Sequence, residues 1–267
     1  MTTTMMMTLE NLQFAKAMPR IEAFNTLRGK VIKGNNYSQF NLCDYTGDDG
    51  MDVIDSRMLL CMQLGIDLDR LIMPRQTHTA NVAVIDRSFI TDSIEHQEQR
   101  LQNVDALVTT LKNVCIGVNT ADCVNIALAD PDAGVIAAVH AGWKGTAARI
   151  AAAAVKQMLK LGASAANIQA SLGAAICRDC FEVGDEVVDH FVQCGFAPDA
   201  IMTRNPDTGK AHIDLKEANR LTLMECGVPQ ANIVVSANCT RCNPDKYFSA
   251  RRLGINSGRV FTGIIMR

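Results

Sequence analysis

The chain has 267 residues, of which 48% are hydrophobic and 20% are charged, a composition typical of a globular protein with a sizeable core. Its net charge of −2 gives no electrostatic reason to expect nucleic acid or a membrane surface as a partner. No apolar run reaches the length of a transmembrane helix, and the Thr/Met-rich start from Met1 to Met7 lacks the parts of a signal peptide, so the expected location is cytoplasmic.

The first half of the chain predicts short strands around one clear helix. Residues 1–20 are expected to form a loosely ordered N-terminus, and residues 21–267 a single domain. Apolar residues recur at helical spacing over 52–64, and Gly65 would end that helix. Residues 87–103 are polar and charged, which predicts a surface loop. Strands are predicted at 71–73, 105–109 and 114–118.

Two apolar runs in the middle of the chain predict a β-hairpin. The runs cover 124–129 and 134–139, and the Asp-Pro-Asp segment at 130–132 is typical of a turn. Cys123 precedes the first run, and His140 follows the second. An antiparallel pair folds their separation of 17 residues (140 − 123) back on itself. We therefore expect the thiol and the imidazole at the same end of the hairpin.

The segment after His140 predicts an anion site. Residues 147–161 have a helical composition, and Thr146 is the predicted N-cap. The glycine loop at 142–145 would present backbone N–H groups at the positive end of the helix dipole, and Lys144 adds a full charge. An ordinary strand-to-helix connection is the alternative, because short glycine loops are common.

The remainder of the chain points to a fold class. A helix is predicted over 185–194, and Asp214 would cap another that ends at Cys226. Strands outnumber helices and often follow one another directly, which favours an α+β class with mixed sheets over regular βαβ winding. Further strands are predicted at 167–172, 211–214, 232–236 and 259–265.

Three residues form a candidate metal site. His78, flanked by two threonines, joins Cys123 and His140 as a possible ligand. Three ligands and one open position are typical of catalytic Zn²⁺, while the same His₂Cys set also occurs in blue copper sites. A multicopper oxidase needs many His-x-His pairs, and this chain has five histidines and no such pair. Without a metal, Cys123 and His140 could act as nucleophile and base.

Two Cys-x-x-Cys pairs add a second cluster of thiols. The pairs are Cys177/Cys180 and Cys239/Cys242, with a gap of 59 residues (239 − 180) that exceeds a compact zinc ribbon. The pairs could hold a structural Zn²⁺, or the first could be a redox pair. Reduced cysteines that line a polar pocket are the third alternative. Most of the ten cysteines are expected to be packing residues.

Six motifs occur in an order that resembles a known family. The chain is similar, over roughly residues 20–265, to the polyphenol oxidase (laccase) domain family, whose members are also described as purine nucleoside phosphorylase and adenosine deaminase enzymes. The motifs are Gln76-x-His78, Asp105-Ala-Leu-Val-Thr109, Thr120-Ala-Asp-Cys123, Val139-His-Ala-Gly-Trp-Lys-Gly145, Phe181-Glu-Val-Gly184 and Phe248-Ser-x-Arg-Arg252.

The resemblance implies a fold, a metal and an activity. The fold would be a single α/β/α-type domain related to toxin deamidases, with Zn²⁺ held by residues that match His78, Cys123 and His140. The activity would be phosphorolysis of adenosine, inosine, guanosine and methylthioadenosine to the base and ribose 1-phosphate, plus hydrolytic deamination of adenosine. The partners would be purine nucleosides and phosphate, and the assembly a monomer or a homodimer. A copper-dependent polyphenol oxidase and a metal-free hydrolase using Cys123 and His140 are the alternatives.

The resemblance also implies residues that contact the substrate. Polar pocket positions of the family match Arg28, Asn41 and Gln76, although the segment around Arg28 reads Thr-Leu-Arg-Gly-Lys where the family has Thr-Arg-x-Gly-Gly. From the residues themselves, we expect phosphate near the glycine loop at 142–145 and Lys144 or Arg251. The family usually has arginine at position 144, and lysine lacks the bidentate geometry of a guanidinium. Asp122 is the candidate proton carrier beside the metal.

Overall fold

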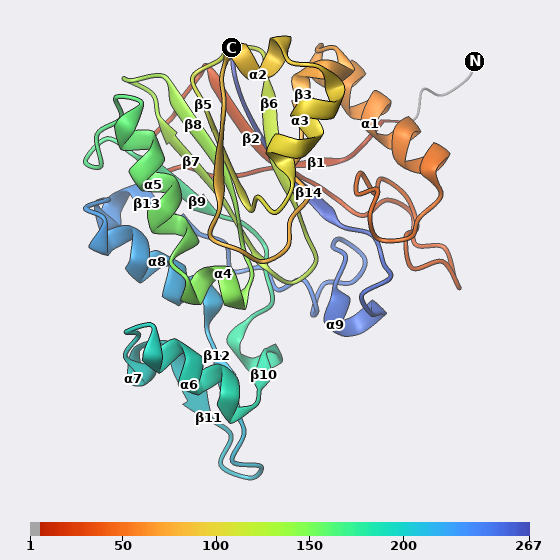
Figure 1. The fold of residues 1–267 in the computed structure, drawn as a ribbon. Helices are drawn as coiled ribbons and strands as arrows, with labels where there is room; N and C mark the ends of the chain where they lie inside the picture. Colours follow the sequence, from red (N-terminus) through yellow and green to blue (C-terminus); the bar gives the residue numbers. More distant parts are fainter. Residues whose placement is uncertain (1–5) are drawn as a thin grey trace.

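The computed structural model describes residues 6–267, and two mixed β-sheets stacked face to face form its centre (Figure 1). The first sheet has five strands in the order β1-β2-β14-β6-β3. Only β3 and β6 run parallel in it; the other neighbours are antiparallel. Its strands are β1 (Leu9–Asn11), β2 (Ile21–Thr26), β3 (Leu71–Ile72), β6 (Cys115–Thr120) and β14 (Val260–Met266).

The second sheet has six strands in the order β13-β9-β7-β8-β5-β4, with parallel pairs at both edges. Its centre is the predicted hairpin, which the structure confirms: β7 and β8 pair antiparallel around the turn after Asp130. Apolar side chains point to both faces of this hairpin, because both faces are buried. The strands are β4 (Val82–Ile85), β5 (Ala106–Thr109), β7 (Val124–Asp130), β8 (Val135–Ala141), β9 (Gln169–Leu172) and β13 (Ile233–Val235).

Alternation along β8 shows how the core is divided. Ile136 and Ala138 pack between the two sheets, whereas Val139 and Ala137 pack against the helices on the other side. Helices α5 (Ile150–Lys160) and α8 (Leu215–Glu225) cover that outer face, and α1 (Gly50–Leu64) covers the outer face of the five-stranded sheet. The predicted α+β class with mixed sheets flanked by helices is therefore confirmed, and the β layer between the helices is double.

A small lobe extends from the six-stranded sheet toward the lower edge of Figure 1. It contains a three-stranded antiparallel sheet in the order β10-β12-β11, and two helices beside it. Phe191 and Ile213 of this lobe join the same core as the six-stranded sheet. Its elements are β10 (Glu182–Val183), α6 (Asp185–Gln193), α7 (Pro198–Ile201), β11 (Met202–Arg204) and β12 (Ala211–Ile213).

Several local predictions are confirmed at their caps. Helix α1 ends at Gly65, which has a left-handed φ of 65°. The Asp214 side chain accepts a hydrogen bond from the backbone of Glu217 at the start of α8. Across residues 6–267, no helix combines the length and the apolar character that crossing a membrane requires.

Three other predictions are wrong. The loosely ordered start does not extend to residue 20, because β1 pairs with β2 and Met7 is buried; residues 1–5 lie outside the described part. The predicted loop at 87–103 contains helices α2 (Arg87–Thr91) and α3 (Ile94–Leu101), which the side chains of Asp86 and Ser93 cap. Their polar composition reflects exposure, not absence of structure.

The third error concerns the helix after the hairpin. It begins four residues early as α4 (Trp143–Ala147) and restarts as α5 after Arg149, which has a left-handed φ of 62°. Thr146 is therefore inside α4 and caps nothing. Its hydroxyl donates to the Ala141 carbonyl and accepts from Asn219. The remaining helix, α9 (Ala250–Leu253), precedes β14.

Candidate active site

The predicted trio of His78, Cys123 and His140 converges at one end of the β7–β8 hairpin. Asn125 pairs with His140, so Cys123 emerges beside the end of β8. One ligand atom from each of the three side chains lies within 4.8 Å of the others, and Cys123 Sγ is 3.8 Å from His78 Nε2. His140 is buried, Cys123 is half-buried and His78 is exposed. The trio thus lies at a surface opening.

The buried carboxylate of Asp105 holds two of these residues in place. It accepts hydrogen bonds from the backbone N–H groups of Thr77, His78 and Thr79 and from the Thr79 hydroxyl. Its Oδ1 also lies 2.7 Å from His140 Nδ1. Because a carboxylate only accepts, Nδ1 carries a proton, and Nε2 is the His140 nitrogen left to interact with Cys123 or with a metal ion.

The same contacts set the protonation states of the metal-free site. Burial alone would raise the pKa of the Cys123 thiol, but His140 and His78 lower it to about 6. Burial would lower the pKa of His140, but the Cys123 thiolate and Asp105 raise it to about 9. Near neutral pH the pair is therefore a thiolate and an imidazolium, and a thiolate is the form that binds a soft metal or attacks an electrophile.

The trio fits a metal ion. Its donor set, two imidazoles and one thiolate, suits Zn²⁺ or copper, and the hydrogen bond to Asp105 is the usual support for a ligating histidine. Gly142 leaves room for the ligands: a Cβ there would lie 2.6 Å from His78 Cδ2 and 3.1 Å from Cys123 Sγ.

A cavity of about 570 Å³ opens over the trio, a size suited to a small organic ligand. Arg259 adds a guanidinium to its wall, but hydrogen bonds to the carbonyls of Ile255 and Ser257 tie that group to the chain. Trp143 and Phe181 add two aromatic side chains to the lining. Six predicted residues line the cavity: Gln76, His78, Asp122, Cys123, His140 and Arg251.

Arg28, Asn41 and Lys144 do not line this cavity. Arg28 is buried against the Phe248 ring and donates to Ser38 and to the Pro244 carbonyl. The amide of Asn41 is held by the backbone of Cys43 and Arg259 and by Asp48. Both side chains are therefore used in loop packing.

The predicted phosphate loop has a different structure. Lys144 is exposed in α4, with its ammonium 5.5 Å from the Trp143 ring centroid. Gly145 is buried, and a Cβ there would lie 2.9 Å from the Thr79 carbonyl oxygen. This glycine allows α4 to pack closely on the loop that carries His78, so its role is steric.

Asp122 and Arg251 are held to each other and to a third segment. Asp122 has a φ of 84°, and its carboxylate accepts from the Thr240 hydroxyl and from the backbone N–H of Arg251, each at 2.6 Å. The Arg251 guanidinium lies 5.5 Å from the Phe181 ring centroid and donates to the Glu182 carbonyl. Both Asp122 oxygens are engaged, which suits a positioning role better than the predicted proton transfer.

Sequence reasoning missed Asp105 and Thr240 as parts of this site. Asp105 does lie in one of the six motifs, as a carboxylate directly before a buried strand, and that position was its signal. Thr240 stands between the cysteines of the second Cys-x-x-Cys pair, where nothing in the local pattern points to Asp122.

The side-chain amide of Gln76 pairs with the backbone of Asn119. Its Nε2 donates to the Asn119 carbonyl at 2.8 Å, and its Oε1 accepts from the Asn119 N–H at 2.7 Å.

Two imidazoles and a thiolate, supported by a buried carboxylate and open to a cavity, define an enzyme-type site that can bind a metal. The chain belongs to the family described as multi-copper polyphenol oxidoreductase laccase, whose model matches residues 22–267.

Two named relatives and one solved structure match this chain over most of their length. A protein named adenosine deaminase RL5, from an unknown prokaryotic organism, is 58% identical over 97% of this chain and 99% of its own. A protein named purine nucleoside phosphorylase from Bacteroides thetaiotaomicron is 38% identical over 92% of both. The crystal structure of YlmD from Geobacillus stearothermophilus has a TM-score of 0.84 at 31% identity and covers 94% of this chain and 93% of that one.

Proposed function

We propose that this protein is a zinc-dependent purine nucleoside enzyme. It deaminates adenosine, and it also cleaves adenosine, inosine, guanosine and methylthioadenosine with phosphate. The observation that carries the proposal is the convergence of His78, Cys123 and His140 in the lining of a cavity large enough for a nucleoside. The names of the two relatives support the same pair of activities.

The metal would be held by His78 Nε2, Cys123 Sγ and His140 Nε2. A zinc ion there supplies activation of water at neutral pH and polarisation of the substrate. Asp105 keeps His140 in the tautomer that presents Nε2, and its hydrogen bonds to the backbone of residues 77–79 fix the loop that carries His78. The protein thus orients the ligands before substrate arrives.

In deamination, the oxygen of water bonds to C6 of adenosine, the bond from C6 to the exocyclic amino group breaks, and ammonia and inosine leave. The aromatic side chains of Trp143 and Phe181, which line the cavity, suit a flat purine. Asp122 acts indirectly: its carboxylate accepts a hydrogen bond from the backbone N–H of Arg251 and so holds that residue in place.

In phosphorolysis, an oxygen of phosphate bonds to the ribose C1′, the bond from C1′ to the base breaks, and the base takes the bonding electrons and a proton. Arg251 is the cation best placed to hold the phosphate, because Lys144 does not line the cavity and the Arg259 guanidinium is tied by hydrogen bonds to backbone carbonyls. The planar guanidinium of Arg251 can also form the bidentate contact that a lysine cannot.

The test is chromatography of metal-quantified protein incubated with adenosine, with and without phosphate. We expect inosine in both samples and adenine with ribose 1-phosphate only where phosphate is present. His78→Ala should lose the metal and both activities. Intact adenosine in both samples, with zinc bound, would contradict the proposal.

A second candidate function rests on the lowered pKa of Cys123. A thiolate beside His140 is also the pair of a cysteine hydrolase. Turnover by fully chelated protein that stops on alkylation of Cys123 would favour that function.

Oxidation of phenols in proportion to copper content would favour the polyphenol oxidase that the family description names. The expected monomer or homodimer stays a prediction.

A further inference from the structure

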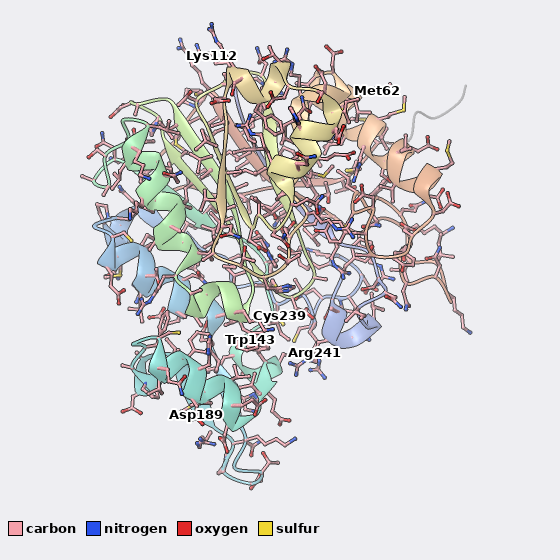
Figure 2. All side chains as sticks on the ribbon, viewed as in Figure 1. Met62, Lys112, Trp143, Asp189, Cys239 and Arg241 are labelled. Atoms are coloured by element: carbon pink, nitrogen blue, oxygen red, sulfur yellow. The ribbon has the colours of Figure 1, made fainter. Side chains whose placement is uncertain are left out.

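Four cysteines form a second cluster, separate from the trio of the active site. The Sγ atoms of Cys177, Cys180, Cys239 and Cys242 all lie within 4.8 Å of one another, and those of Cys180 and Cys242 are 3.5 Å apart. All four cysteines are free thiols. Figure 2 shows Cys239 near the junction between the sheets and the small lobe, with Arg241 beside it.

The backbone brings the two Cys-x-x-Cys segments together in matching turns. In each segment the residue after the second cysteine donates its backbone N–H to the carbonyl of the first cysteine: Phe181 to Cys177, and Asn243 to Cys239. An isolated parallel bridge joins Ala175 to Cys239. The 59-residue gap that exceeded a compact zinc ribbon is therefore closed by tertiary structure.

The arrangement matches the needs of a tetrahedral thiolate site. With Zn–S bonds of about 2.3 Å, the sulfurs of such a site lie about 3.8 Å apart, within the span of this cluster. The backbone N–H of Cys177 donates to Cys239 Sγ at 3.3 Å, and Arg241 donates to Cys180 Sγ at 3.4 Å. Both donors favour negative charge on sulfur.

We propose that Cys177, Cys180, Cys239 and Cys242 bind a second Zn²⁺ ion. Four protein ligands leave no open position, so this ion is structural, in contrast to the open trio of the active site. The cluster is a metal site in its own right, and the inference does not depend on the proposed nucleoside chemistry.

The second ion would hold one wall of the catalytic cavity. Ile176 and Phe181, on either side of the first Cys-x-x-Cys segment, line the cavity. Thr240, inside the second segment, donates to Asp122, which anchors the backbone of Arg251. The second zinc ion would therefore join the segment that carries Phe181 to the segment that carries Thr240, which positions Arg251 through Asp122.

The experiment counts metal in the full-length protein, purified with zinc under reducing conditions. We expect about two zinc ions per chain in the wild type and about one in His78→Ala/His140→Ala. Adding Cys239→Ser/Cys242→Ser to that variant should remove the remaining ion. Cys226→Ser is the control, because Cys226 is a free thiol, half-buried, and lies outside both clusters; it should keep two ions.

Wild-type protein supplies an independent test should the serine variants fail to fold. Iodoacetamide should label Cys180 and Cys242 only after a strong chelator has removed zinc, and the unfolded protein should have the mass of ten free thiols. Cobalt substituted into the His78→Ala/His140→Ala variant should give the absorption of a tetrahedral thiolate site.

Two results would overturn the proposal. One is a single zinc per chain in the wild type that disappears entirely in His78→Ala/His140→Ala. The other is a mass lower by two hydrogens with Cys180 and Cys242 resistant to alkylation, which would show a disulfide in place of the metal.

Discussion

Asp105→Asn is the substitution that tests the logic of the active site most directly. The side chain keeps its size but loses its charge, and one of its two acceptor oxygens becomes an NH₂ group. In the native site Oδ1 serves His78 and His140, while Oδ2 serves Thr77 and Thr79. Whichever way the amide turns, one of these two sets of donors faces another donor.

The magnitude follows from the number of donors displaced. At least two hydrogen bonds to a charged group are lost, each contributing about 1.5–3 kcal/mol, so the free energy of unfolding should fall by about 3–6 kcal/mol. Loss of the partner of a ligating histidine typically lowers metal affinity about 10- to 100-fold. Both effects should appear, because the carboxylate serves the fold and the ligand geometry at once.

The assay pairs urea unfolding with a zinc competition titration. Asp130→Asn is the matched control: Asp130 is also fully buried and accepts backbone N–H groups, but it lies at the opposite end of the same hairpin. It should lose stability and keep metal affinity. If Asp105→Asn binds zinc as tightly as the wild type, the role we assign to Asp105 is refuted.

Three further predictions concern the same cavity. Gly142→Ala should lower zinc affinity and destabilise the protein by about 1–3 kcal/mol through overpacking against His78; circular dichroism and metal titration measure the two, and an unchanged affinity would contradict the steric argument. Arg251→Ala should raise the KM for phosphate about 10- to 100-fold, the value of a hydrogen bond to a charged group, whereas Lys144→Ala should leave it unchanged; equal effects in steady-state kinetics would argue against Arg251. In metal-free protein the alkylation rate of Cys123 should rise as pH increases through about 6, because the thiolate is the reactive form; a midpoint near the ordinary thiol pKa of about 8.5 would show that the imidazoles do not act on it.

The hairpin, with Cys123 and His140 at one of its ends, could be predicted because local patterns determine it. Two apolar runs of strand length on either side of an Asp-Pro-Asp turn predict an antiparallel hairpin. That pairing brings Cys123 to the end of β8. His78 was harder, because its loop is far away in sequence. Its place depends on Asp105, whose hydrogen bonds to residues 77–79 hold that loop beside His140.

The helices at 87–103 and the break at Arg149 were missed for a different reason. Exposed helices need few apolar residues, so α3 has a polar composition and is recognisable chiefly by the Ser93 cap. The break between α4 and α5 depends on the left-handed backbone conformation of Arg149, which the residue type alone does not predict. In both cases the decisive signal was a backbone angle or a cap.

The substrate residues show where inference from motifs ends. A motif supplies residue types in order, but whether a side chain reaches the cavity depends on which partners take up its hydrogen bonds. The side chains of Arg28 and Asn41 form their hydrogen bonds with loop residues, and Lys144 is exposed on α4. Arg251 reaches the cavity because Asp122 holds its backbone. Since Asp122 is in turn held by Thr240, the cation is positioned by a segment that the cysteine cluster closes, and the two sites are joined through that chain of contacts.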